Sequence, residues 1–452
     1  MNTSRHSIDM TSGNVWKQLT TFALPVFLGE CFQLSYSVID SAIVGRVVGE
    51  AALAAVGASE TITRVIVGFF NGVSIGYTVI VARTFGRKAE QELQDAVHTI
   101  VLISLAMGLI LSVLGMACSS LLLRMMDIPA DTAPLALVYL RIYFSGLFGL
   151  VEYNTISGIL RAVGDSRRPL YFLIFSSVLN TALDWLFVAV FRWGIQGAAY
   201  ATIASQIISA ILCLTLLMRT REPWRFTWDG SIDRKAVKEI FVIGIPTGFQ
   251  KSIVSLSNVL VLSHISVFGT SCLSGWVVYT RISHVVTMTS QSLTSGLTTF
   301  IGQNLGAKEY RRVREGIRTG LLQTLMVAGA LTASLLLMRH PIIRLFGDSY
   351  QMITYAERFA RWLLSFQLIH AFMSVYIAVV RGGGKAMQGT LCMILGLVIF
   401  RQIYLYIVTS IVNTPMAVAF CWPFGWLMSG MLIYVYYKIR MHGFTFEEEE
   451  ES

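Results

Sequence analysis

Long apolar runs, separated by short polar stretches, follow one another along almost the whole chain. A helix needs about 20 apolar residues to cross the hydrocarbon core of a bilayer, whereas a barrel strand needs only about 10. The runs are continuous rather than alternating, so we expect an all-α integral membrane protein. Twelve spans are predicted, at roughly 18–48, 55–82, 98–123, 135–160, 169–191, 197–218, 238–268, 272–302, 316–338, 355–380, 387–411 and 418–437.

A polar linker divides these spans into two groups of six. We expect an N-terminal six-helix bundle at 1–218, a cytoplasmic linker at 219–237 and a C-terminal six-helix bundle at 238–440. An acidic cytoplasmic tail is expected at 441–452. Because six is an even number, both bundles enter the membrane from the same side, and a pseudo-two-fold axis along the membrane normal relates them.

The two halves match residue by residue at a nearly constant offset, which indicates an internal duplication. Two bundles built from the same repeat suit alternating access, in which they rock about a site between them. At an offset of 220 or 221 residues, the matched pairs are Pro25 with Pro246, Gly86 with Gly306, Arg161 with Arg381, and Gly197 with Ala417.

Composition and charge agree with a membrane location. Hydrophobic residues make up 54% of the chain and charged residues 13%, with a mean hydropathy of +0.64. The net charge of +9 comes from bases on alternate loops, as the positive-inside rule expects of cytoplasmic loops, and not from one basic domain that would bind nucleic acid. We therefore expect a multi-pass protein of the cell inner membrane, acting as a monomer, with both termini in the cytoplasm.

Five polar residues of the N-terminal half are predicted to meet in one layer of its bundle. Counted inward from the outer ends of their spans, Asp40 and Asp184 both lie at a depth of about 12–14 Å. Asn180 stands four residues before Asp184 and shares its helix face. Tyr139 and Thr202 enter from the same side, about five residues into their spans. The repeat-equivalent positions of Asp40, Asn180 and Asp184 in the C-terminal half are not acidic, so coupling is expected in one half only.

Two carboxyl groups in a low-dielectric layer cannot both ionise cheaply, so one can hold a proton near neutral pH. The same oxygens, with Asn180 and Thr202, also suit Na⁺. We favour H⁺ and leave Na⁺ open as the coupling ion. No cofactor and no other metal is expected, since the cysteines and histidines show no ligand spacing.

Further polar residues inside the spans are candidates for a substrate cleft. If its bases line the cleft, an anionic or zwitterionic substrate is favoured; the alternative is that they pair with acids or extend to the interface. Pro25 is predicted to kink the first span and act as a hinge. The candidate cleft residues are Glu30, Gln33, Tyr36, Lys251, Arg281 and Arg401.

Four stretches resemble the multidrug and toxic compound extrusion (MATE) transporters: "LPVFLGECFQLSYSVIDSAIVGRVVG", "GILRAVGDSRRP", "LNTALDWLFVAVFRWGIQGAAYAT" and "IGQNLGAKEYRRV". The resemblance implies an antiporter of six plus six helices that expels small organic compounds in exchange for H⁺ or Na⁺. The pattern is closest to the branch with archaeal and DNA-damage-inducible (DinF-like) members, whose polar network matches the five residues above. Another branch carries an acid in the seventh span, and this chain has none between Gly244 and Phe268.

Three other functions compete with export as an interpretation of the sequence. A lipid-linked saccharide flippase of the same superfamily requires a wide basic cleft, and Lys251, Arg281 and Arg401 keep this alternative open. A membrane enzyme requires clustered His, Ser or Cys, and the seven histidines are scattered. A channel is expected to repeat its polar ring around the pore, whereas this network occupies one half.

Overall fold

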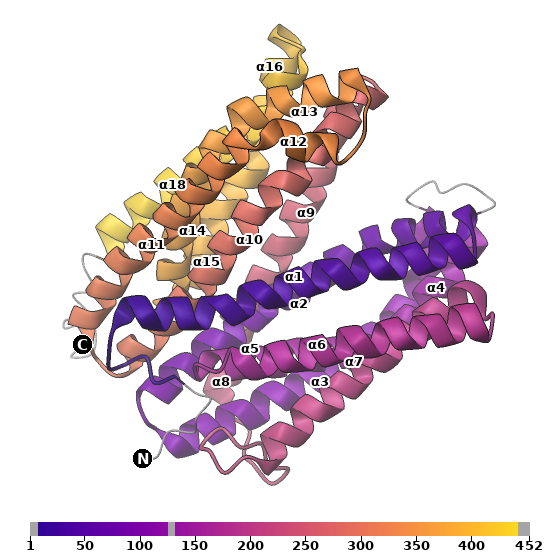
Figure 1. The fold of residues 1–452 in the computed structure, drawn as a ribbon. Coiled ribbons are helices and arrows are strands. Elements are labelled where there is room, and N and C mark those ends of the chain that lie inside the picture. The colour runs from indigo at the N-terminus through magenta and orange to yellow at the C-terminus, as the bar shows by residue number, and fades with distance from the viewer. Residues whose placement is uncertain (1–7, 125–131, 442–452) are drawn as a thin grey trace. The chain divides into compact units, whose positions relative to one another are not determined.

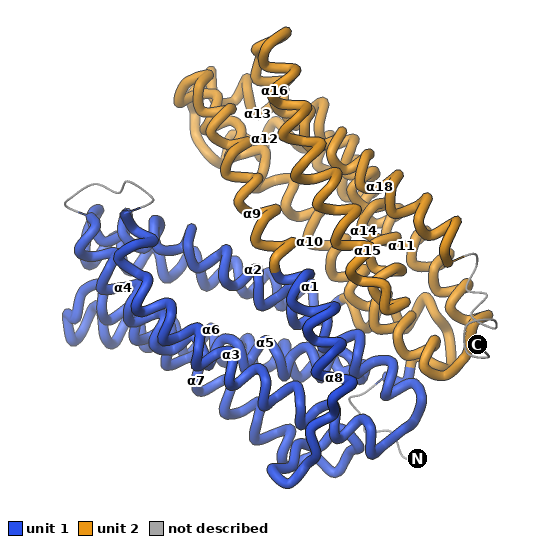
Figure 2. Tube along the Cα trace, turned by 180° about the vertical axis from the view of Figure 1, so that it is seen from behind, with its two compact units in different colours: residues 1–9, 24–248 blue, residues 10–23, 249–452 orange. Residues whose placement is uncertain are grey.

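The computed structural model describes residues 8–124 and 132–441, and all of their regular secondary structure is helical (Figure 1). Most of the predicted acidic tail, residues 442–452, lies outside the described residues. The chain forms two compact units (Figure 2). Unit 1 comprises Met1–Asp9 and Leu24–Gly248, and unit 2 comprises Met10–Ala23 and Phe249–Ser452.

Unit 1 takes most of the first six spans. Its long helices pack on one another, with α5 against α2, α3 and α7, and with α6 against α7. Its elements are most of α1 (Val15–Val47), then α2 (Glu50–Gly86), α3 (Glu90–Arg124), α4 (Ala133–Ser145), α5 (Leu147–Ala162), α6 (Arg167–Asp184), the π-helix η1 (Trp185–Val190), α7 (Gly194–Arg219), α8 (Arg234–Glu239) and the π-helix η2 (Ile240–Gly244).

Unit 2 is built around α10, which packs against α11, α13 and α14. Its elements are most of α9 (Ile245–Ser266), then α10 (Thr270–Gly306), α11 (Tyr310–Leu337), α12 (Arg339–Arg344), α13 (Tyr350–Leu363), the 3-10 turn η3 (Leu364–Phe366), α14 (Gln367–Gly382), α15 (Ala386–Ile394), the π-helix η4 (Leu395–Phe400), α16 (Arg401–Ile411), α17 (Pro415–Ala419) and α18 (Cys421–Arg440).

Every predicted span coincides with a helix or a run of joined helices. Among the described residues, ten such segments are long and apolar enough to cross a membrane, and α4 with α5, bent by 49°, makes an eleventh. The remaining predicted span is α10, which has 37 residues and is rich in Ser and Thr. The all-α membrane fold is therefore confirmed.

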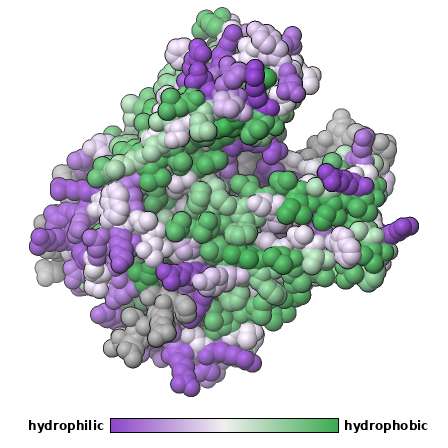
Figure 3. All heavy atoms as spheres, in the orientation of Figure 1, coloured by the Kyte–Doolittle hydropathy of each residue, from purple (hydrophilic) through white to green (hydrophobic). Residues whose placement is uncertain are grey.

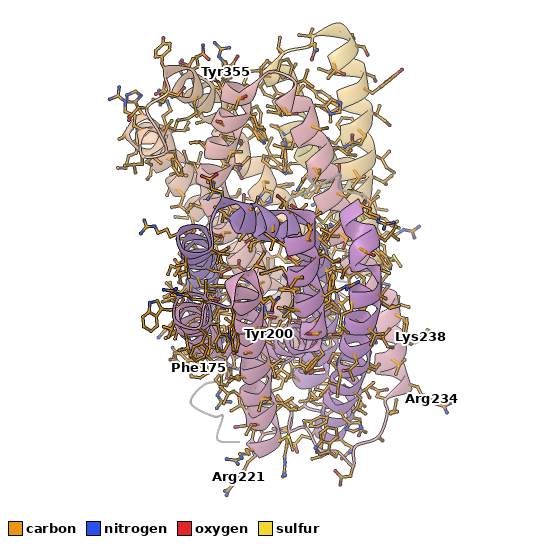
Figure 4. The ribbon with its side chains drawn as sticks, turned by 90° about the vertical axis from the view of Figure 1, so that its right-hand side faces the viewer. Phe175, Tyr200, Arg221, Arg234, Lys238 and Tyr355 are labelled. Atoms are coloured by element: carbon orange, nitrogen blue, oxygen red, sulfur yellow. The ribbon has the colours of Figure 1, made fainter. Side chains whose placement is uncertain are left out.

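Apolar side chains cover the outer flanks of the helices, as contact with lipid requires. On the face drawn in Figure 3, apolar residues spread over the middle of α1 and α6, while hydrophilic residues gather at helix ends. Exposed apolar residues there include Leu24, Leu28 and Val38 of α1, and Phe175 and Val178 of α6. Phe175 extends outward from its helix in Figure 4.

The internal repeat is visible in the backbone itself. Gly49 and Gly269 have φ angles of 114° and 95°, and each precedes the long second helix of its half. Lys88 and Lys308 have φ angles of 57° and 60°. Left-handed conformations at matched positions mean that both halves make the same turns. The duplication seen in the sequence therefore extends to the loops.

The boundaries of the compact units differ from those of the predicted bundles, because residues near the start of each half belong to the unit formed by the other half. Residues 10–23 join unit 2, because the Met10 amide donates to Gln303 Oε1 (3.1 Å) and Arg312 Nη2 donates to the Met10 carbonyl (3.1 Å). The predicted linker and the start of the seventh span join unit 1. There the Asp233 amide donates to Thr99 Oγ1 (2.8 Å). Each entry segment is thus hydrogen-bonded to helices of the opposite half.

The chain passes between the units beside the two matched prolines. The boundaries fall at 23/24 and 248/249, within a few residues of Pro25 and Pro246. The α1 helix continues through Pro25. A proline inside a helix removes the hydrogen bond to the carbonyl four residues earlier, so α1 has a weak point where it leaves unit 2.

We predict that Pro25→Ala slows amide hydrogen exchange in α1 around position 25, because it restores the donor to the Thr21 carbonyl. Hydrogen–deuterium exchange mass spectrometry on the purified protein measures this directly. Pro169→Ala is the matched control, since Pro169 lies in the first turn of α6, where an amide has no intrahelical partner. Equal exchange in Pro25→Ala and the parent protein contradicts the weak-point interpretation.

Candidate functional site

The two aspartates predicted to share a layer face each other inside unit 1. Asp40 lies on α1, seven residues before its end at Val47, and Asp184 is the last residue of α6. Their side chains are 8% and 0% exposed. The two carboxyl groups lie within hydrogen-bonding reach of each other. Counting residues inward along two helices thus predicted the proximity of two groups that are 144 positions apart in sequence.

The carboxyl pair has no cation to balance it. Among the described residues, no Lys or Arg forms a salt bridge with Asp40 or Asp184. Within the same residues, Asp40 Oδ1 and both Asp184 oxygens lack a hydrogen-bond donor. An ionised carboxylate only accepts hydrogen bonds, so the two groups can satisfy each other only when one of them carries a proton. The geometry therefore suits a shared proton.

Tyr139 and Thr202 form a second pair next to the aspartates. The Tyr139 hydroxyl hydrogen-bonds with the Thr202 side chain, and Thr202 Oγ1 donates to the Ala198 carbonyl (3.0 Å). Tyr139 is close enough to Asp40 for their charges to interact, and its ring stacks on Tyr143 with centroids 6.3 Å apart. These contacts hold α4 against α7 at the level of the acids.

Asn180 is buried on α6, one turn before Asp184, with 3% of its surface exposed. Neither its amide nitrogen nor its oxygen has a partner among the described residues. Native proteins rarely leave a buried amide in this condition, because the group has lost its hydrogen bonds to water. An unpartnered amide one turn from Asp184 makes Asn180 a candidate member of the same layer.

Three π-helical segments adjoin positions that the sequence singled out. The segment η1 begins directly after Asp184, η4 ends directly before Arg401, and η2 lies just before Pro246. Each π-turn adds a residue to the helix and rotates the side chains that follow, and such turns are frequent at functional sites. No residue pattern in the sequence indicated them.

Glu60 is a residue of this layer that sequence reasoning missed. Glu60 forms an ion pair with Arg64 on the same helix, at 3.5 Å. Glu60 is also close enough to Asp40, Tyr36 and Tyr139 for their charges to interact. It lies ten residues from the start of α2, so the depth count applied to Asp40 would have found it.

The predicted cleft residues separate into distinct environments. In unit 1, Glu30 and Gln33 are exposed, and Gln33 hydrogen-bonds with half-buried Tyr36, whose neighbours include Asp40. In unit 2, Arg281 is exposed and Lys251 is half-buried. Arg401 is buried. The structure therefore brings Tyr36 close to Asp40, whereas Gln33 contacts only Tyr36 of this set.

Comparison with known proteins places the chain among transporters. A sequence profile of the MatE family matches residues 25–186 and again 246–407, so each half carries one copy that begins at a matched proline. Probable multidrug resistance protein YpnP of Bacillus subtilis is 30% identical over 381 residues, covering 84% of this chain and 85% of its own length. YoeA of the same organism is 27% identical over 438 residues, with 94% of each chain covered.

More distant relatives and solved structures agree. A FAD transporter of Shewanella oneidensis is 25% identical over 354 residues, covering 77% of this chain and 78% of its own. An outward-facing multidrug resistance MATE transporter of the MOP superfamily has a TM-score of 0.90 at 21% identity, covering 98% of this chain and 99% of its own. At that identity the likeness establishes the fold.

We predict that Asn180→Leu raises the melting temperature of the purified protein by about 1 °C, corresponding to about 1 kcal/mol, because it removes a buried amide without partners. Asn304→Leu is the matched control. Asn304 is fully buried, donates to the Met10 carbonyl (3.0 Å) and accepts from Arg312 Nε (3.2 Å). The same substitution there should lower the melting temperature. A loss of stability in Asn180→Leu would show that its amide is satisfied within the protein.

Proposed function

The chain belongs to the MatE family of membrane transporters, and from that premise we propose that it exports organic compounds in exchange for protons bound by Asp40 and Asp184. The observation that carries this proposal is the buried carboxyl pair, which has neither a cation nor another donor among the described residues. Such a pair is stable with one proton and repulsive without it. Proton binding and release thus change the attraction between α1 and α6.

Asp40 lies on a helix that both units share. Residues 10–23, which include the start of α1, belong to unit 2, and the rest of α1 belongs to unit 1. A force on Asp40 therefore acts on the segment beyond Pro25. We infer that loss of the shared proton moves this part of α1 away from α6, with Pro25 as the hinge. This movement is the step that links proton transfer to alternating access.

The contacts around the pair support H⁺ over Na⁺ as the coupling ion. A hard cation requires several oxygen ligands at once. The Tyr139 and Thr202 hydroxyls are hydrogen-bonded to each other, and Thr202 also donates to a carbonyl. This leaves Asn180 and the two carboxyl groups, whose mutual approach already suits a shared proton.

We also propose that coupling is confined to unit 1, as in the DNA-damage-inducible branch. The repeat-equivalent position of Asp40 is Val261, which is fully buried in an apolar cluster. That of Asp184 is Tyr404, whose hydroxyl donates to the Ala417 carbonyl (3.0 Å). Neither side chain can take up and release a proton near neutral pH, because Val has no titratable group and a Tyr hydroxyl keeps its proton there. The YpnP and YoeA names, both multidrug resistance proteins, do not favour the flippase alternative.

The basic loops support a cytoplasmic location for one end of unit 1. Arg221, Arg234 and Lys238 are exposed there and extend away from the helices (Figure 4). Bases accumulate on the cytoplasmic side of membrane proteins. Two of the relatives are bacterial multidrug resistance proteins, and we infer an inner-membrane location with both termini in the cytoplasm.

We predict that Asp40→Asn and Asp184→Asn each slow proton-driven export by at least about 100-fold while leaving the protein folded. An amide can neither bind nor release the shared proton. The measurement uses purified protein in liposomes, with a fluorescent substrate and with pH and Na⁺ gradients imposed separately. Export driven by the pH gradient alone is expected for the parent protein.

Glu152→Gln is the matched control for these variants. Glu152 is another buried carboxyl of unit 1, but its Oε1 accepts from Ser104 Oγ (2.7 Å) and it lies apart from the predicted layer. This variant should keep export within a few-fold of the parent rate. Parent-like export by Asp184→Asn, or export driven only by Na⁺, would refute proton coupling at the aspartate pair.

A further inference from the structure

Buried charges are divided between the units by sign. Among the described residues, no buried Lys or Arg occurs in unit 1, and no buried Asp or Glu occurs in unit 2. The buried acids are Asp40, Glu152, Asp165 and Asp184 in unit 1, and the buried arginines are Arg381 and Arg401 in unit 2. The proposed function assigns a role to two of these acids, Asp40 and Asp184. The positive charge buried in unit 2 has no role yet.

Arg401 is the more deeply buried of the two arginines, with 1% of its surface exposed. It follows η4 and opens α16, and its Nη2 donates to Ser257 Oγ of α9 (2.6 Å). Its guanidinium carbon lies 4.9 Å from the ring centroid of Trp422 on α18. Among the described residues, no carboxylate forms a salt bridge with it. Its partners are a hydroxyl and an aromatic face, and neither cancels a full charge.

Two buried donors of this cluster are unused. Arg401 Nε and Trp422 Nε1 have no hydrogen-bond acceptor among the described residues. They belong to groups in direct cation–π contact, so both serve the same small region. Trp276 extends the aromatic surface, with its ring centroid 6.2 Å from that of Trp422. The buried positive charge and the two unused donors suit an anionic hydrogen-bond acceptor. The neighbouring indole rings suit a planar ring attached to that acceptor.

Helix packing alone does not account for this arrangement. A buried charge without a counter-ion is costly, and apolar residues of similar volume commonly pack at least as stably. Ser257 Oγ already accepts a hydrogen bond from Gln402 (2.9 Å), so α9 and α16 are joined without the guanidinium. The contact between α9 and α16 therefore does not require the charge.

We propose that the Arg401–Trp422 cluster binds the oxyanion of a transported organic anion, a planar aromatic carboxylate or phosphate. The proposal rests on the exporter function inferred above and specifies its substrate class. Ser257 holds the guanidinium while the site is closed. An oxyanion replaces that hydroxyl, because a charge-assisted bond to guanidinium is about twice as strong as a neutral one. The indole rings of Trp422 and Trp276 then cover the ring of the compound.

The test compares two dyes that share a xanthene ring but differ in charge, namely anionic fluorescein and cationic rhodamine 6G. Fluorescence anisotropy on the purified full-length protein measures the binding of each dye. Arg401→Gln should weaken fluorescein binding tenfold or more and leave rhodamine 6G binding unchanged or tighter. Arg401→Lys should recover part of the loss, because an ammonium keeps the charge but not the planar fork.

Ser257→Ala provides a second test in case Arg401→Gln does not fold. It removes the competing partner of the guanidinium, so fluorescein should bind several-fold more tightly. Arg381→Gln is the matched control, because it also removes a buried arginine of unit 2. Arg381 donates to Gln250 Oε1 (3.0 Å) near the end of α14, and its loss should leave the ratio of the two affinities unchanged.

Competition identifies the oxyanion, and transport separates the two proposals. Displacement of fluorescein by benzoate or by phenyl phosphate supports the cluster, whereas displacement by neither overturns it. An equal loss of affinity for both dyes in Arg401→Gln also overturns it, since that result indicates that the arginine has a structural role. Proton-driven export of rhodamine 6G without fluorescein binding refutes this inference but not the exporter. Proton-driven export of neither dye contradicts the proposed function itself.

Discussion

Two carboxyl groups buried against each other without a cation must share a proton or separate, and the account of this transporter depends on that constraint. Asp40 and Asp184 meet in unit 1, where the described residues offer them no other donor. Both residues are buried, so two ionised groups there would repel each other more strongly than in water. A change of protonation therefore has to appear as a change in how α1 packs on α6.

In the proposed mechanism, the helices that connect the two units transmit that change. Residues 10–23 are hydrogen-bonded within unit 2 through Gln303 and Arg312, while Asp40 is packed within unit 1. The seventh span repeats the arrangement in reverse, since its first part belongs to unit 1. Both helices lose a backbone hydrogen bond to proline near the place where they change units. Each half thus has one helix that runs from one unit into the other. Of these two helices, α1 carries Asp40, which lies next to Asp184.

The sequence was sufficient for the spans and for the meeting of Asp40 with Asp184, because membrane thickness fixes span length and helical rise converts position into depth. It was insufficient where the outcome depends on tertiary packing. The π-turn after Asp184, the bonding of residues 10–23 to unit 2, and the unpartnered amide of Asn180 arise from contacts between distant segments. Glu60 was missed for another reason, since its ion pair with Arg64, four residues later, accounts for it within one helix.

The most direct test of the central claim is infrared spectroscopy of protonated carboxyl groups in the purified protein at neutral pH. A shared proton predicts a carbonyl-stretch component that disappears in both Asp40→Asn and Asp184→Asn, because each variant dissolves the pair. The same component should persist in Glu152→Gln, which removes a different buried carboxyl. A spectrum in which neither aspartate variant loses a protonated-carboxyl component would contradict the account.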